Sequence, residues 1–142
     1  MILLTLLKLD FEYDYDFLLL GISCHEKDYR LCWAINNKLG FDLKKSQELE
    51  IKEKNRKELS SYSLYSFEEI EKYREYYVIA NRTNDRFLIP EQKQADYFIL
   101  IKGNISRPEK DLFIKNIKEI NMILAVFIIN PNELKSKQNL LF

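Results

Sequence analysis

Residues 123–129, ILAVFII, form a continuous apolar run that ends at Asn130-Pro131. The run is too short to cross a bilayer, because a membrane helix needs about 20 apolar residues. Apolar residues at every position, rather than at every second one, are typical of a strand that is buried on both faces. We therefore expect residues 123–129 to form a central strand of a sheet, which Asn130-Pro131 ends.

Several other segments predict strands of the same sheet. Residues 17–22 are compatible with either a strand or a short helix. Gly21 favours the strand, because glycine costs about 1 kcal/mol inside a helix. Asn84-Asp85 suits a tight turn between two strands, and Pro90 ends the second of them because it has no N–H to donate. The predicted strands are residues 2–9, 17–22, 49–51, 62–67, 73–82, 86–89 and 95–102.

Two segments predict helices. For residues 24–39, Ser23 and Glu26 have the spacing of a capping box, and Gly40 is a typical stop. For residues 107–119, Ser106 and Glu109 form a second capping box. The apolar residues of the two segments recur at helical spacing and predict one buried face on each helix: Leu31, Cys32, Ile35 and Leu39 in the first, and Leu112, Phe113, Ile117 and Ile120 in the second.

These elements predict one α+β domain over residues 1–142. Its mostly antiparallel sheet has about five to seven strands and is covered by the two helices. The chain has 22 acidic and 22 basic residues, so it lacks the basic excess that is typical of nucleic-acid-binding proteins. We expect neither a membrane partner nor a signal peptide, because charges interrupt the apolar N-terminal segment and no basic region precedes it.

The cysteines and the single histidine do not predict a catalytic or metal site. On one helix, Cys24 and Cys32 would lie about 12 Å apart, too far to share an ion or form a disulfide. His25 is the sequence neighbour of Cys24 and points away from it on a helix, which disfavours a nucleophile–base pair. We therefore expect reduced thiols in a cytoplasmic protein and no cofactor or metal.

Residues 20–23, LGIS, resemble the turn of a helix-turn-helix motif. The positions that would pack its second helix onto the first hold Lys27 and Arg30. Two cations do not form a core pair, because burying an unpaired charge is costly. DNA binding through this segment is therefore disfavoured.

Two segments have the composition of a binding surface. Arg30 and Trp33 are spaced for a cation–π pair, with Asn36 one turn further on, so this helix face suits packing on a loop or contact with a partner or ligand. Residues 73–82, YREYYVIANR, suit either a structural strand or a stacking platform for single-stranded RNA. The platform would use Tyr73, Arg74, Tyr76, Tyr77 and Arg82.

Glu91 and Asp96 lie in residues 88–100, LIPEQKQADYFIL, and could be an acid–base pair or structural carboxylates. Five residues correspond to about 500° of helix, so the two cannot share a helical face. In a strand Asp96 shares a face with Phe98 and Leu100. We expect Asp96 to be buried there and to bind the backbone amides of residues 90–94, or Arg30.

The same stretch resembles a family signature. Ile89-Pro90-Glu91, three residues, and Ala95-Asp96-Tyr97 resemble the motif of the IPExxxVDY family, which groups small bacterial proteins of unknown function. Ala95 stands where the family name has Val. Residues 27–36 and the C-terminal LKSKQNLLF are also similar to that family. The resemblance implies no activity, cofactor or catalytic residue.

Three functions stay open from the sequence. The first is a non-enzymatic module that binds a protein partner or associates with itself, because no catalytic constellation is evident and aromatic residues are plentiful. The second is an RNA-associated accessory protein. The third is a small-molecule-binding protein or enzyme with a site near Arg30, Glu91 and Asp96.

Overall fold

The computed structural model describes residues 17–53, 56–140 and 142. The strand predicted at residues 2–9 lies outside them. The strands are β1 (Leu18–Ser23), β2 (Lys44–Lys45), β3 (Leu49–Lys52), β4 (Leu59–Tyr62), β5 (Leu64–Glu69), β6 (Arg74–Ala80), β7 (Arg82–Thr83), β8 (Arg86–Phe87), β9 (Tyr97–Lys102) and β10 (Ala125–Ile129). The helices are α2 (Asp28–Leu39) and α3 (Arg107–Lys118), with short 3-10 helices η2 (Ile70–Lys72), η3 (Pro90–Gln92), η4 (Pro131–Glu133) and η5 (Lys137–Leu140).

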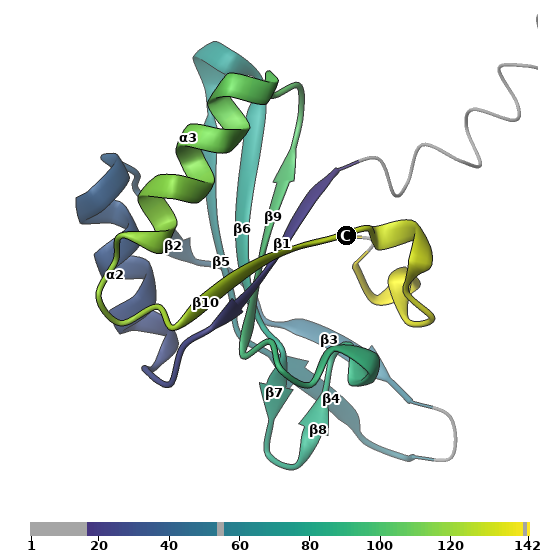
Figure 1. The fold of residues 1–142 in the computed structure, drawn as a ribbon. Helices are drawn as coiled ribbons and strands as arrows, with labels where there is room; N and C mark the ends of the chain where they lie inside the picture. The colour runs from purple at the N-terminus through teal and green to yellow at the C-terminus, as the bar shows by residue number, and fades with distance from the viewer. Residues whose placement is uncertain (1–16, 54–55, 141) are drawn as a thin grey trace, which may run out of the picture.

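Six strands form one antiparallel sheet in the order β10-β1-β9-β6-β5-β2. The strand pairs β3–β4 and β7–β8 form two small separate sheets. Figure 1 shows α2 and α3 together on one side of the main sheet, while the C-terminal 3-10 helices lie on the other side. The predicted α+β class, with two helices and an antiparallel sheet of five to seven strands, is confirmed.

Each face of the sheet has its own apolar core. On the helical face, Leu31 and Ile35 of α2 and Ile117 of α3 pack with strand residues such as Ile22 and Ile99. On the opposite face, strand residues pack with the β3–β4 pair, with residues 88–95 and with the C-terminal segment. The C-terminal segment docks on this face, because Leu140 is fully buried in this second core.

Helix α2 begins four residues later than predicted. Ser23 is the last residue of β1 and pairs with Ala125, so it is strand rather than helix cap, and residues 24–27 connect the strand to the helix. The first helical carbonyl is that of Lys27, which accepts from the amides of Arg30 and Leu31. The capping box predicted at Ser23 is therefore wrong. The predicted end is right, since Gly40 adopts the left-handed conformation with φ +68°.

Helix α3 starts as predicted. The Ser106 hydroxyl accepts from the Glu109 amide at 3.3 Å and donates to the Glu109 carboxylate at 2.9 Å. The predicted strand at residues 62–67 is divided between β4 and β5, and the turn at Asn84-Asp85 joins β7 to β8. No helix within the described residues is long and apolar enough to cross a membrane.

The position predicted for residues 123–129 is wrong, because β10 lies at an edge of the sheet. Val126 packs against the helical-face core, and Phe127 and Ile129 against the opposite core. A continuous apolar run indicates that a strand contacts the core on both of its faces. It does not report how many neighbouring strands it has, and β10 has one, β1, among the described residues.

Candidate functional site

The predicted pair of carboxylates has structural partners. The Cys24 amide donates to Asp96 Oδ2 at 2.9 Å, and Arg82 Nη2 lies 3.4 Å from Asp96 Oδ1. Asp96 therefore fixes the end of β1, where the chain leaves the sheet for α2. The predicted partners of Asp96, which were the amides of residues 90–94 or Arg30, are not the ones it binds.

Glu91 lies in η3 and binds the C-terminal segment. Its carboxylate accepts from the Ser136 amide at 2.7 Å and from the Ser136 hydroxyl at 3.0 Å. Partial burial opposes ionisation, but the bonds from its own amide, from Ser136 and from the Lys135 amide outweigh it and lower the pKa of Glu91. Pro90, the predicted strand stop, is the first residue of η3, and β8 ends earlier, at Phe87.

The other predicted residues of the signature and of α2 have separate contacts. The Tyr97 hydroxyl donates to the Glu26 carbonyl at 2.6 Å, and burial raises the pKa of Tyr97, with nearby acidic groups adding to it. Arg30 lies 3.4 Å from the Glu26 carboxylate rather than over the ring of Trp33, which is 66% exposed. Asn36 bonds both the amide and the carbonyl of Leu43, which fixes the loop after α2.

Asn81 holds the loop of residues 89–95 in place, and the sequence analysis did not single it out. Its side chain is completely buried and donates to the carbonyls of Gln92 and Ala95, both at 2.9 Å. Its Oδ1 accepts from the Ile89 amide at 2.8 Å, and its backbone carbonyl accepts from Leu88. An asparagine directly after an apolar strand was the available signal, because a buried amide needs several partners.

The structure does not assemble the proposed RNA platform. Tyr76 is buried in the helical-face core and Arg74 is 7% exposed, whereas Tyr77 packs on the opposite face against Phe142. Tyr73 is 88% exposed and lies outside β6, at the end of η2, where its backbone is left-handed. Stacking of successive bases needs rings on one surface.

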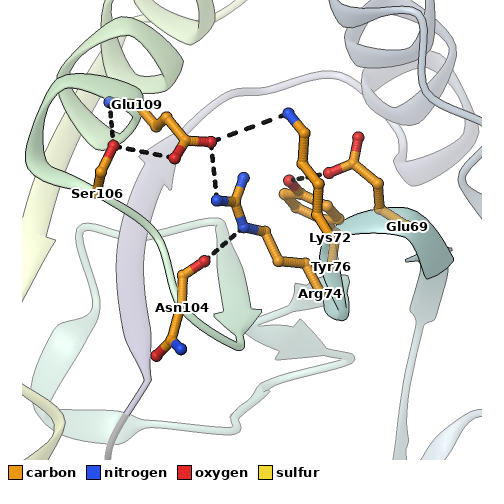
Figure 2. A network of polar contacts seen from close by, with 7 residues as sticks. All are labelled: Glu69, Lys72, Arg74, Tyr76, Asn104, Ser106 and Glu109. Carbon is orange, nitrogen blue, oxygen red and sulfur yellow. Dashed lines mark hydrogen bonds and ion pairs between the residues drawn. The ribbon is translucent and has the colours of Figure 1, made fainter.

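A hollow of about 270 Å³ lies where α3 covers β5 and β6. Figure 2 shows its polar wall, in which the Arg74 guanidinium lies 2.8 Å from the Glu109 carboxylate and donates to the Asn104 carbonyl at 2.6 Å. Lys72 approaches the same carboxylate at 3.9 Å. The Tyr76 hydroxyl donates to Glu69 at 3.0 Å.

The chemistry available in this hollow is limited. Burial is the main cause that raises the pKa of Tyr76, so its hydroxyl stays protonated at neutral pH. Glu109 is occupied by Arg74 and by its helix cap, and these bonds lower its pKa. The floor is aromatic, since the Phe41 and Tyr76 rings lie 4.5 Å apart. The arrangement binds α3 to the sheet and offers neither a nucleophile nor a free base.

The second candidate site is the outer edge of β10, which has no neighbouring strand within residues 17–53, 56–140 and 142. Ile128 is 60% exposed and Leu124, which directly precedes the strand, is 62% exposed. A groove of about 430 Å³ lies beside the C-terminal half of the strand, between β10, η3 and η4. Three consecutive strand residues line it, Phe127, Ile128 and Ile129, and the opposite wall carries Glu91, Gln92 and Gln94. Glu91 is thus the predicted site residue that lies at this groove.

Neither cysteine is positioned for chemistry. Cys24 and Cys32 are free and 1% exposed. Burial raises the pKa of Cys24, and burial with the nearby charge of Asp28 raises the pKa of Cys32 to about 12, so both are neutral thiols at pH 7. Among the described residues, no three His, Cys, Asp or Glu side chains are grouped to hold a metal ion.

No protein-family model matches the chain, and the searches of curated proteins and of solved structures find no match either.

Proposed function

We propose that this protein is a non-enzymatic interaction module that binds an extended polypeptide segment along β10. The observation that carries the proposal is the exposed, wholly apolar edge of the main sheet. An edge strand presents backbone N–H and C=O groups that pair with an added strand, and this is a recurrent mode of peptide recognition.

The two edges of the sheet differ in length and in charge, and only β10 has the composition that pairing with an added strand requires. The opposite edge, β2, has only two residues, and both are exposed lysines, Lys44 and Lys45. Short length and lysine are the usual devices that keep an edge strand from pairing. Strand β10 has five residues and neither a charge nor a proline. In the part of the chain that the structure describes, one edge is therefore protected and the other is open.

The groove beside β10 supports the same function. It gives a bound segment an apolar wall on the strand side and amide groups on the other, from Gln92 and Gln94. Peptide grooves that use strand addition combine a backbone ladder with such side pockets. The two buried thiols support a reducing, cytoplasmic setting, and the resemblance to the IPExxxVDY family adds no activity to the proposal.

The test is affinity purification from the native cell with three baits: the wild type, Ile128→Lys and Leu112→Lys. Leu112 is the matched control, because it is an equally apolar side chain of similar exposure, 57%, but lies on α3. Proteins that bind through β10 are retained by the wild type and by Leu112→Lys and are lost with Ile128→Lys. Equal recovery of every partner by all three baits contradicts binding at this edge.

A second candidate function is the binding of a small amphipathic molecule in the hollow at Arg74. The observation in favour is its combination of an aromatic floor with a wall of two acidic and two basic side chains. Here Leu112→Lys is the test variant, because Leu112 lines the hollow, and Ile128→Lys is the control. A compound that binds there raises the melting temperature of the wild type and of Ile128→Lys, but not that of Leu112→Lys.

A further inference from the structure

We infer that the segment bound by β10 is β10 of a second copy of this chain, which makes the protein a two-fold symmetric dimer with one continuous antiparallel sheet. The inference rests on the proposed function and names its partner. It starts from the backbone: among the described residues β10 pairs with β1 alone, so its outer side lacks a neighbouring strand.

Two-fold symmetry restricts how two β10 strands can pair. In an antiparallel pair, residues directly opposite each other point to the same face of the sheet. A two-fold axis perpendicular to the sheet therefore passes between one residue and its own copy. The exposed side chains select which residue this is. With Val126 opposite Val126 of the second copy, Leu124 of each chain lies opposite Ile128 of the other.

This register covers the two exposed apolar side chains at this edge with each other. Leu124 and Ile128 are 62% and 60% exposed in the single chain. Leu124 directly precedes β10 and is held beside the end of β1, since its amide donates to the Ser23 carbonyl at 2.8 Å. Cross-strand apolar pairs of this kind are the stabilising unit of a sheet. A register centred on Phe127 instead places Leu124 opposite the polar Asn130.

Charge and shape also fit a second copy. Residues 123–129 contain no charged side chain, so self-pairing brings no like charges together. In the Val126 register, the small exposed Ala125 of the second copy lies opposite Phe127, at the groove of about 430 Å³. The groove therefore gives room to the segment that leads into the partner strand.

The experiment uses the purified chain alone. Analytical ultracentrifugation over a range of concentrations is expected to show a reversible dimer for the wild type and for Leu112→Lys, and a monomer for Ile128→Lys. Both substitutions are at exposed positions, and a cooperative melting transition of each variant excludes unfolding as the cause.

Oxidative cross-linking tests the register. Val126→Cys places two thiols directly opposite each other and is expected to give a disulfide-linked dimer. Ile128→Cys is the control, because in this register its thiol lies four strand positions from its copy, about 13 Å at 3.3 Å per residue. The buried Cys24 and Cys32 do not compete. Cross-linking of Ile128→Cys as efficient as that of Val126→Cys overturns the register.

The outcomes separate this inference from the proposed function. A wild-type chain that stays monomeric, while the cellular purification still yields a partner that Ile128→Lys loses, overturns self-pairing and keeps strand addition to another protein. A monomer with no edge-dependent partner overturns both. A dimer that Ile128→Lys leaves intact overturns β10 as the interface.

Discussion

The ring of Phe127 in β10 lies over Gly21, the residue directly opposite it in β1. A Cβ atom at Gly21 would lie 2.3 Å from the nearest ring carbon, well inside contact distance. The glycine therefore leaves the space that Phe127 fills in the core opposite the helices. The sequence presented Gly21 only as a residue that disfavours a helix, and the structure gives the reason for its place in a strand.

Gly21→Ala is expected to destabilise the fold by about 1–3 kcal/mol, the usual cost of overpacking a core. Urea unfolding of the variant measures this loss. The double variant Gly21→Ala with Phe127→Leu removes the ring carbons that clash, so it is expected to lose less than the sum of the two single variants. Additive losses in this cycle contradict the contact as the cause.

A second prediction concerns Asn81. Asn81→Ala removes the side-chain partner of the Ile89 amide and of the Ala95 carbonyl, and one of the two donors to the Gln92 carbonyl. A buried polar group that loses its partner costs about 1–3 kcal/mol, so the free energy of unfolding is expected to fall by at least that amount. Asn121→Ala, at an exposed position, is the control and is expected to stay within about 0.5 kcal/mol of the wild type. Equal stability of the two variants contradicts the role of Asn81.

Local signals in the sequence predicted most of the elements. The cap at Ser106, the stop at Gly40 and the turn at Asn84-Asp85 depend on short-range chemistry, and the structure has all three. The start of α2 was predicted too early because β1 continues through Ser23, which pairs with Ala125, a residue distant in sequence. Local propensity does not take account of pairing with a residue that is distant in sequence.

The candidate sites were harder to predict than the fold. Apolar side chains show which faces of a strand are covered, so residues 123–129 could be recognised as a strand but not as an edge. The pairing of Arg74 with Glu109 joins β6 to α3 and likewise depends on the sheet order. The spacing of Glu91 and Asp96 allowed an acid–base pair, but each carboxylate binds a different backbone amide.

The third prediction concerns the pH dependence of the Arg74–Glu109 pair. The pKa of Glu109 in the folded chain is below its ordinary value of 4.5, mainly because Arg74 and Ser106 bond the ionised form. A depressed pKa stabilises the fold above the unfolded value, and the contribution is lost as the pH falls through the folded value. Glu109→Gln is therefore expected to be less stable than the wild type at pH 7, with the gap closing below pH 4.5.

Urea unfolding of both proteins between pH 7 and pH 3 measures this gap. The solvent-exposed Glu119, which pairs with Lys38 on the surface, provides the control variant Glu119→Gln. A surface pair contributes little, so a small gap is expected at every pH. A gap for Glu109→Gln that stays constant down to pH 3 contradicts the ion pair as its source.

The last prediction concerns the contact between Glu91 and Ser136. Glu91 accepts two hydrogen bonds from Ser136, and beyond it Asn139 donates to the Leu88 carbonyl while Leu140 is fully buried. Glu91→Gln removes the charge and one accepting oxygen, so the C-terminal segment is expected to open more often. Hydrogen exchange of the amides in residues 132–140 is expected to quicken while that of β9 is unchanged. Glu133→Gln, a neighbouring acidic residue in η4, is the control, and equal acceleration in both variants would show that lost charge alone, rather than the Ser136 contact, loosens the segment.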